Sequence, residues 1–536
     1  MFNNGGMRRT ETTLLIAFVA LCAMFAAVLR GDAPWASERL AWFDGTRPTA
    51  SALQAMEILA ASAGHGLEPQ DYDADALVRS LQRATQEPLD AATIAYLEQR
   101  LTAAMERYLA DVHGGRISAQ QLPYGRTAPN RNPFDPAAYL QDALARGRLR
   151  EAAREAAPRL WQYEQLRTEL ARYRALADDP AWNTPLPALP AGTRGSPPKL
   201  EPGQPYAGLV RLRERLIALG DLAPDGAPTV TYDGAVLDAV ISFQRRHGLK
   251  ADGMVGKATL AQLEVPPAAR ARQIVLSLDR LRWTPLLHGP RMIVINVPEF
   301  VLRAYEVQGD RILVRETMKI IVGKSMDTRT PLLEEQMRFI EFQPYWNVPP
   351  SIARGEVMPR LRRDPAYFDR EGFEFVTAQG QVVESLTPGM LDAVTAGRAR
   401  IRQRPGPRNA LGDIKFVFPN RENIYLHHTP AVQLFERDRR DFSHGCIRVD
   451  QPVALAGFVL RGMSEWTEER VRLAMASGVS STLRLTEPVR VLIAYGTVLV
   501  KDGRIHFYDD IYGHDRTLDA ALQRRTSERR PLDTRP

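Results

Sequence analysis

The sequence contains only two cysteines in 536 residues, Cys22 and Cys446. A disulfide-rich scaffold is therefore excluded, and folding has to rest on hydrophobic cores. The sequence also lacks a glycine-rich phosphate loop and a run of Lys and Arg interleaved with aromatic residues, so nucleic-acid binding is not expected. The net charge of +7 still suits an anionic partner such as a membrane surface or an acidic cell wall. The length exceeds what one core usually supports, so we expect two to four domains.

Charged residues are absent from Thr12 to Leu29, a run that directly follows two arginines and Glu11. A run of this length approaches the roughly 20 residues that a membrane-spanning helix needs. We therefore expect a signal anchor in residues 1–34, with a cleaved signal peptide as the alternative. Flanking arginines stay in the cytoplasm, which places the remaining chain outside it. There, Cys446 has no disulfide partner and is either a tolerated buried residue or a reactive thiol.

The first half of the exported chain has a helical character. Ala, Leu, Arg and Glu dominate from about residue 35 to residue 176, and apolar residues recur at helical spacing. Eight prolines between residues 180 and 205 exclude a regular element there and indicate a linker. Residues 35–200 are therefore predicted to be a helical scaffold domain followed by a proline-rich linker.

A small bundle of three helices is predicted in residues 201–266. Leu212, Leu216 and Leu219 share one helix face, and an Asp-Gly pair at 252–253 supplies a tight turn. The string AVISFQRRHGLKADGMVGKATLAQLEV, which starts at residue 239, resembles the peptidoglycan-binding domain of cell-wall enzymes. The resemblance implies a module that binds peptidoglycan or orients a neighbouring domain.

The sequence after residue 266 is rich in β-branched residues and turn signals. It predicts the hairpins of a mixed or antiparallel sheet over residues 267–485, with strands at 414–418 and 423–427. Residues 350–404 interrupt the strands and are too long for an ordinary connection, so we interpret them as an inserted capping segment. Residues 486–536 are predicted to be a C-terminal strand and tail. The expected fold class is multidomain α+β, with a mostly β domain after the helical domains.

Three of the nine histidines, His427, His428 and His444, lie within 20 residues of Cys446. A thiol is a strong nucleophile at neutral pH only as the thiolate, so a cysteine enzyme needs an imidazole to remove its proton. His427 ends a predicted strand 19 residues before Cys446 and fits this role. A tetrahedral oxyanion also needs N–H donors, and Gly445 permits a tight turn whose amides are candidates.

Two other interpretations of this cluster compete with the catalytic one. Zinc could be bound by the three histidines together with Cys446. Adjacent histidines on a strand point to opposite faces, however, and a His-Gly-Cys sequence is cramped for tetrahedral ligation. The second competing interpretation is a purely structural cysteine.

The stretch YLHHTPAVQLFERDRRDFSHGCIRV, residues 425–449, resembles the signature of the YkuD-type L,D-transpeptidase catalytic domain. That signature is an upstream His followed by Ser/Thr-His-Gly-Cys-x-Arg/Asn. The strings IIVGK at 320–324, FQPYWNVPPSI at 342–352 and RPGPRNALGDIKFVFPN at 404–420 extend the resemblance to the large periplasmic subgroup. In that subgroup a scaffold domain and a peptidoglycan-binding domain accompany a catalytic domain with a capping insertion.

The resemblance implies a role for each residue of the motif. Cys446 would be the acyl-enzyme nucleophile and His427 its general base. Ser443, His444 and Gly445 would shape the oxyanion hole.

Further residues are implied on the substrate side. Arg448 is expected to handle a carboxylate, and Trp346 and Asn347 are expected to contact substrate. His428 stands where an Asp is more usual, so its contribution to orienting the base is left open. Tyr425 is interpreted as a core residue.

The resemblance also implies a reaction. The donor would be a tetrapeptide stem of peptidoglycan that loses its terminal D-alanine, and the acceptor would be the side-chain amine of another stem, which gives a 3→3 cross-link. Carbapenem β-lactams are the expected inhibitors, no metal or organic cofactor is implied, and the protein would be periplasmic and anchored in the inner membrane. The alternatives are a non-catalytic wall-binding scaffold, a wall-anchoring transferase and an L,D-carboxypeptidase with the same nucleophile.

Overall fold

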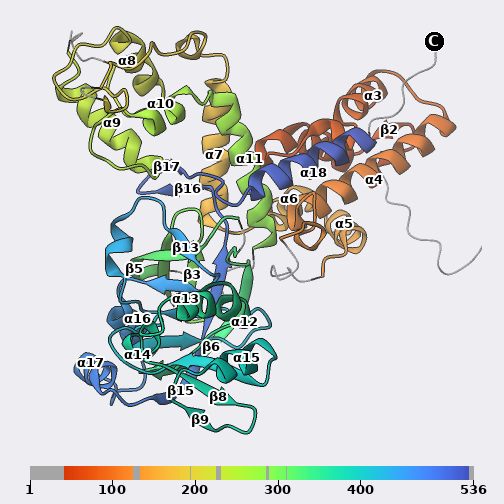
Figure 1. Ribbon diagram of the computed structural model, residues 1–536. Helices are drawn as coiled ribbons and strands as arrows, with labels where there is room; N and C mark the ends of the chain where they lie inside the picture. Colours follow the sequence, from red (N-terminus) through yellow and green to blue (C-terminus); the bar gives the residue numbers. More distant parts are fainter. Residues whose placement is uncertain are drawn as a thin grey trace, which may run out of the picture. The chain divides into compact units, whose positions relative to one another are not determined.

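The computed structural model describes residues 42–124, 133–192, 195–224, 231–284, 289–309, 311–326 and 328–529 (Figure 1). The chain divides into two compact units: one takes in residues up to 60, 72–107 and 136–153, and the other takes in 61–71, 108–135 and everything from 154 onward. The predicted membrane segment, residues 12–29, lies outside the described residues. None of the described helices combines the length and the apolar character that a bilayer crossing requires.

The first unit is helical apart from one small hairpin, as its sequence predicts. Trp42 is fixed at its start, because its Nε1 donates to Thr102 Oγ1 at 2.8 Å. The amides of Trp42 and Phe43 both donate to Glu98 Oε1 at 2.9 Å, so one carboxylate holds the entering chain. The elements are β1 (Phe43–Asp44), β2 (Arg47–Pro48), α2 (Ala50–Ala60), α3 (Ala74–Gln86) and α5 (Pro136–Ala145), with α4 (Ala91–Gly114) and α6 (Leu149–Ala156) continuing into the second unit.

The predicted three-helix bundle forms within the second unit. Its helices are α8 (Leu209–Ala218), α9 (Gly234–Arg246) and α10 (Lys257–Glu264). Gly253 lies in the predicted turn with φ +73°, and a Cβ there would lie 2.3 Å from Leu237 Cδ1. Glycine is required at this turn both for its backbone conformation and for the close approach of α9.

The proline-rich segment packs against this bundle, which corrects the prediction of a linker belonging to the preceding domain. The fully buried guanidinium of Arg215 on α8 donates to the carbonyls of Ala181 and Thr184, each at 2.9 Å. Leu200 forms a β-bridge with Val255. The prolines prevent a helix or strand, but the carbonyls of the segment remain available to a buried donor.

Nine strands of the C-terminal half form one mixed sheet (Figure 1). Their order is β13-β5-β14-β12-β11-β6-β15-β3-β4, and β4 also pairs with β5, so all strands except β13 form a closed ring. Three pairs are parallel, β12 with β14, β13 with β5 and β15 with β3. The strands are β3 (Arg291–Asn296), β4 (Val301–Gln308), β5 (Arg311–Gly323), β6 (Leu333–Phe342), β11 (Ile414–Val417), β12 (Leu426–His427), β13 (Asp441–Ser443), β14 (Ile447–Val449) and β15 (Ser481–Ala494).

Alternate residues of these strands fill one hydrophobic core. Leu426, Ile447 and Val449 are completely buried in it, together with Leu455 of α16 (Pro452–Val459). Helix α17 (Glu468–Ala476) contributes Val471 to the same core. Burial of each aliphatic side chain contributes about 1.5–3 kcal/mol, so the sheet has a firm basis for positioning the residues on its other face.

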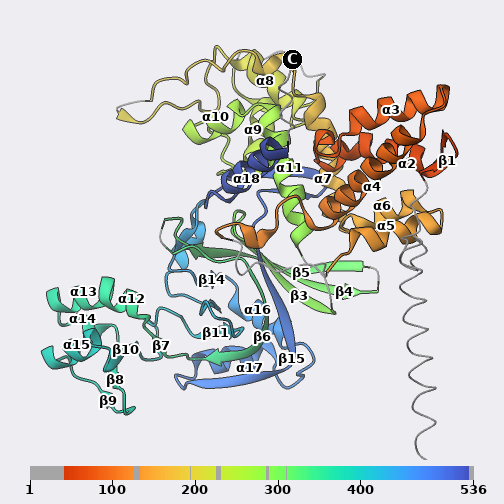
Figure 2. The same cartoon turned by 90° about the vertical axis from the view of Figure 1, so that its right-hand side faces the viewer.

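The predicted capping insertion is present, and it is a folded subdomain rather than a loop. We call residues 346–403 the cap; Figure 2 shows its elements grouped together. They are β7 (Trp346–Asn347), α12 (Pro350–Ile352), the π-helical turn η6 (Ala353–Val357), α13 (Met358–Arg363), α14 (Tyr367–Arg370), β8 (Phe373–Thr377), β9 (Val382–Val383), α15 (Pro388–Thr395) and β10 (Ala399–Gln403). The strands form their own sheet, and Phe368, Phe373 and Phe375 lie in a core separate from that of the large sheet.

The C-terminal segment contains more structure than the predicted strand and tail. Strand β15 continues across the boundary placed at residue 485, and β16 (Val498–Lys501) pairs with β17 (Arg504–Phe507) in a separate hairpin. Helix α18 (His514–Arg529) then lies beside α11 (Pro267–Trp283) in both views (Figures 1 and 2). Leu518 and Leu522 are buried there against Leu276 and Trp283, and this apolar contact explains why the segment is helical.

Candidate active site

Two parallel strands bring the candidate nucleophile and base together. Leu426 of β12 pairs in register with Ile447 of β14, and both side chains are buried in the core. Because side chains alternate along a strand, the residues next to this pair face the opposite side of the sheet. His427 follows Leu426 and Cys446 precedes Ile447, so they are diagonal neighbours on strands roughly 4.8 Å apart.

The backbone orients the His427 imidazole. Its Nδ1 lies 2.5 Å from the backbone carbonyl oxygen of His428, and the Leu411 carbonyl also hydrogen-bonds the ring. A carbonyl oxygen only accepts, so we assign the proton to Nδ1. The lone pair of the neutral ring is then on Nε2, which is the nitrogen available as a base.

The electrostatic surroundings keep His427 neutral. Burial lowers its pKa from 6.5 to about 3, and the nearby positive charge of Arg448 acts in the same direction. The carbonyls of His428 and Leu411 favour the protonated ring and oppose this shift, but burial prevails. A neutral imidazole is the form that can accept a proton from a thiol.

Cys446 is half-buried and is the free thiol of the described chain. Its Sγ donates to the Asn423 carbonyl at 3.6 Å, and Asn423 has φ +53°, a left-handed conformation that Asn tolerates better than most residues. Burial raises the pKa of Cys446, whereas hydrogen bonds from Tyr425 act to lower it. At rest the pair is therefore a thiol and a neutral imidazole, not an ion pair.

Tyr425 belongs to this site, which corrects its interpretation as a core residue. Its hydroxyl acts to lower the pKa of the Cys446 thiol, and its ring meets the His427 ring edge-on at 5.8 Å between centroids. Lys415 Nζ lies 4.5 Å from the Tyr425 ring centroid and 3.0 Å from Glu341 Oε2. The i, i+2 spacing of Tyr425 and His427 on a strand could have placed both on one face.

The turn before the nucleophile is fixed by two hydroxyl groups, one from the turn itself and one from Thr330. Ser443 Oγ donates to the Cys446 carbonyl at 2.5 Å, and Thr330 Oγ1 donates to the Gly445 carbonyl at 2.8 Å. Gly445 has φ +114°, which favours glycine, and its amide donates to Ser443 Oγ at 3.2 Å. Ser443 and Gly445 thus shape the turn. Within the described chain, the amides of His444 and Cys446 donate to no protein acceptor.

The side chains of the other two histidines point to carboxylates. His428 Nδ1 lies 2.7 Å from Asp413 Oδ1, and His444 Nε2 lies 2.6 Å from Glu356 Oε1 in the cap. The side chain of His428 therefore does not orient His427; its backbone carbonyl does. A zinc site would require the two rings to point to a common centre. These contacts instead direct them to two different carboxylates.

The residues predicted on the substrate side lie in two places. Trp346 packs against the core of the cap and pairs with Gln403 in its sheet, whereas Asn347 is exposed. Arg448 is half-buried on β14 with its Nε lacking a hydrogen-bond partner among the described residues. Burial lowers the pKa of Arg448, and the neighbouring Cys446 opposes that shift. Only Arg448 of these three lies beside the nucleophile in the sheet.

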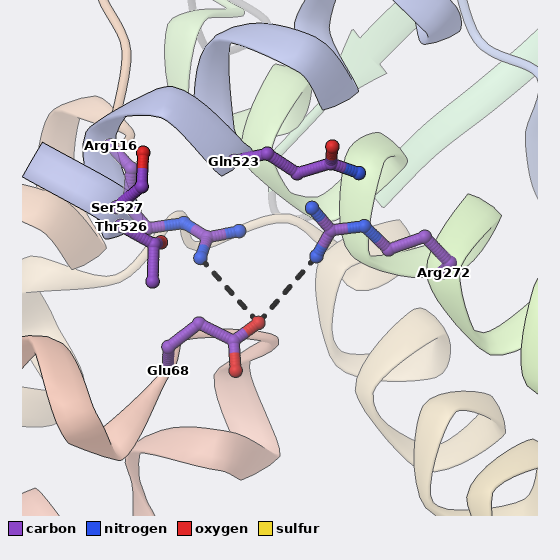
Figure 3. Close-up of a pocket in the computed structure, with 6 residues that line it drawn as sticks. All are labelled: Glu68, Arg116, Arg272, Gln523, Thr526 and Ser527. Atoms are coloured by element: carbon purple, nitrogen blue, oxygen red, sulfur yellow. Dashed lines mark ion pairs between the residues drawn. The ribbon is translucent and has the colours of Figure 1, made fainter.

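A separate polar hollow of about 290 Å³ lies elsewhere in the second unit (Figure 3). Arg116 Nη1 and Arg272 Nη1 converge there on Glu68 Oε1 at 3.7 and 3.5 Å, so one carboxylate bridges the two guanidinium groups. The lining residues are Glu68, Arg116, Arg272, Gln523, Thr526 and Ser527. It contains none of the predicted site residues, and we assign it no part in the chemistry.

Three parts of the chain match known protein families. Residues 290–473 match the sequence model of the L,D-transpeptidase catalytic domain, named YkuD. Residues 290–473 are an L,D-transpeptidase catalytic domain. Residues 36–170 match the scaffold domain, and residues 206–263 match the family described as "Putative peptidoglycan binding domain". The transpeptidase domain contains every site residue discussed above, and the predicted family resemblance is confirmed.

A Haemophilus influenzae protein named "Putative L,D-transpeptidase" is 32% identical over 253 residues, which are 47% of this chain and 49% of that protein. The match thus spans about half the length of this curated relative. A solved structure of Bdellovibrio bacteriovorus Bd1075 is also similar, with 13% sequence identity and a TM-score of 0.16. The match covers 44% of this chain and 56% of the chain in that structure.

Proposed function

We propose that this chain is a peptidoglycan L,D-transpeptidase that forms 3→3 cross-links through an acyl-enzyme on Cys446. The observation that carries the proposal is the register of β12 and β14, which makes Cys446 the diagonal neighbour of a neutral, backbone-oriented His427 on one face of the sheet. The match of residues 290–473 to the L,D-transpeptidase domain supports the reaction class.

In the first half-reaction, the Cys446 thiol leaves the Asn423 carbonyl and passes its proton to Nε2 of His427. The thiolate attacks the carbonyl of the diamino acid in a tetrapeptide stem, and the amides of His444 and Cys446 stabilise the oxyanion. Protonated His427 then donates its proton to the departing amine. D-alanine is released, and a thioester links the stem to Cys446.

In the second half-reaction, the side-chain amine of another stem attacks the thioester. His427 takes the proton that the amine nitrogen loses, the amide of the cross-link forms, and the Cys446 thiol is regenerated. Tyr425 stabilises the developing thiolate in both halves through its hydroxyl. Arg448, beside the nucleophile, is the cation suited to a carboxylate of either stem.

The proposed setting is the periplasm, with the chain anchored in the inner membrane by residues 12–29 and positioned on the wall by the three-helix domain. The match of residues 206–263 to a peptidoglycan-binding family supports the positioning on the wall.

Carbapenems, which mimic the donor, are the proposed inhibitors. Alternatives that use the same nucleophile are an L,D-carboxypeptidase, in which water is the acceptor, and a transferase that attaches a protein to the wall. A non-catalytic scaffold would not need a reactive Cys446.

Purified protein incubated with disaccharide-tetrapeptides tests the proposal. We expect an acyl adduct on Cys446, release of D-alanine and a 3→3 dimer, all detected by mass spectrometry. Hydrolysed tripeptide without dimer would favour the carboxypeptidase, and the absence of both adduct and D-alanine release would favour the scaffold. The Cys446→Ala variant is the control for non-enzymatic products.

A further inference from the structure

One residue of the cap contacts the nucleophile turn directly. Glu356 Oε1 lies 2.6 Å from His444 Nε2, and the two residues are 88 positions apart in sequence. The Glu356 side chain is 55% exposed and that of His444 is 28% exposed, so the pair remains accessible to a ligand. Cys446 follows His444 by two residues, so this pair lies at the edge of the thiol site.

The cap is built to hold Glu356 in this position. Glu356 belongs to η6, a single π-helical turn between α12 and α13. The extra residue of a π turn shifts the side chains that follow it, and such turns are frequent at functional sites. Ala353 and Val357, at the two ends of the turn, are buried in the cap core. The turn is thus anchored on both sides, while Glu356 between them points to the catalytic sheet.

The proposed reaction leaves one proton without a destination. A side-chain amine has a pKa of about 10.4, so the acceptor arrives as an ammonium ion at neutral pH. An ammonium ion has no lone pair and has to lose one proton before it attacks. The nitrogen loses a second proton as the amide forms, and His427 can accept only one of the two.

We propose that Glu356 and His444 form the binding site for the acceptor amine, an inference that rests on the proposed function. The Glu356 carboxylate binds the ammonium ion, and the His444 imidazole accepts its first proton. Free amine and imidazolium result, and the imidazolium is stabilised by Glu356 until it releases the proton to solvent. The amine then forms its bond to the thioester carbonyl, and His427 accepts the second proton. The bond to Cys446 Sγ breaks, and His427 returns that proton to Sγ, which regenerates the thiol.

This assignment gives the cap a role in the choice of acceptor. Water needs neither an anionic binding site nor a prior deprotonation, so hydrolysis of the thioester should not depend on Glu356. Attack on the thioester by an uncharged amine should not depend on Glu356 either. Methoxyamine is such a nucleophile at neutral pH and therefore separates recognition of the positive charge from general access to the thioester.

The test uses the full chain acylated with tetrapeptide stems, compared as wild type, Glu356→Gln and Glu356→Asp. Glu384→Gln is the matched control, because Glu384 is an exposed acid of the same cap that pairs with Arg404 at 3.5 Å. Release of D-alanine reports acylation, and mass spectrometry reports cross-linked dimer, hydrolysed tripeptide and methoxyamine adduct.

We expect Glu356→Gln to release D-alanine and form the methoxyamine adduct at wild-type rates, and to lower the ratio of dimer to hydrolysed tripeptide about tenfold or more. Glu356→Asp should restore part of the ratio, and Glu384→Gln should not change it. An unchanged ratio in Glu356→Gln would overturn the inference, as would equal losses of dimer and methoxyamine adduct. If wild-type protein releases no D-alanine, the proposed function fails instead, and that outcome is distinguishable from the others.

Discussion

The Nδ1 of His427 donates to the backbone carbonyl of His428, the next residue in the chain, at 2.5 Å. The His428 side chain points elsewhere and pairs with Asp413. Since the orienting group is a backbone carbonyl, substitution of the His428 side chain leaves that hydrogen bond in place. Removal of the His427 side chain should therefore lower the rate of acylation more than removal of the His428 side chain.

We expect His427→Ala to lower the second-order rate constant of acylation about 10²- to 10⁴-fold, because general base catalysis is lost. His428→Ala should lower it far less. The measurement is D-alanine release from tetrapeptide stems by both variants. Equal losses would mean that the His428 side chain, with Asp413, takes part in the proton transfer.

The Cys446→Ala variant should form no covalent adduct with a carbapenem, since the variant has no nucleophile. It should unfold at nearly the wild-type temperature, because the side chain is half-buried and lies outside the hydrophobic core. Intact-protein mass spectrometry and thermal unfolding check the two parts. An adduct on the Ala variant would refute the assignment of Cys446.

Tyr425→Phe should make the thiol harder to ionise. Burial already raises the pKa of Cys446, and the Tyr425 hydrogen bond partly opposes this, so its removal raises the pKa further. The rate of alkylation by iodoacetamide rises with pH as the thiolate forms. We expect the midpoint of this rise to move to higher pH in Tyr425→Phe. A midpoint that stays the same or moves lower would show that the hydroxyl does not stabilise the thiolate.

The depressed pKa of His427 predicts an unusual pH profile. An ordinary histidine becomes protonated as the pH falls through about 6.5, and a base of that kind loses activity there. His427, with a pKa of about 3, stays neutral over that range. The second-order rate constant for carbapenem acylation, which reports the free enzyme, should therefore show no inflection near pH 6.5. A clear inflection there that disappears in His427→Ala would contradict the pKa.

Removal of the cap should favour hydrolysis of the thioester by water over attack by the acceptor amine. Trp346 and Gln403 are register partners at the two ends of the cap, so a short Gly/Ser turn can replace residues 347–402 without displacing the large sheet. Aminolysis competes with hydrolysis at a thioester, and a cover that excludes water favours aminolysis. We expect the ratio of hydrolysed tripeptide to dimer to rise. An unchanged ratio in a folded variant that still releases D-alanine would exclude a role of the cap in partitioning.

Much of the architecture could be predicted from the sequence because it depends on local pattern. Helical spacing before residue 176 and β-branched runs after residue 290 correspond to the observed helices and strands. The interruption of the strand pattern located the cap. Proline content, however, predicted a free linker, whereas the buried Arg215 and the Leu200–Val255 bridge show where that segment packs. The helix α18 was missed because its few apolar residues become informative only against α11.

The sequence by itself determined the chemistry available to this protein: one thiol outside the N-terminal segment, three histidines near it, and a glycine that permits the turn between them. The tertiary structure decided what each group does. Strand register placed Tyr425 against the thiol and gave the orienting role to a backbone carbonyl, and the cap brought Glu356 to His444 across 88 residues. Such contacts depend on which strands pair and how subdomains pack, and local periodicity along the chain contains no information on either.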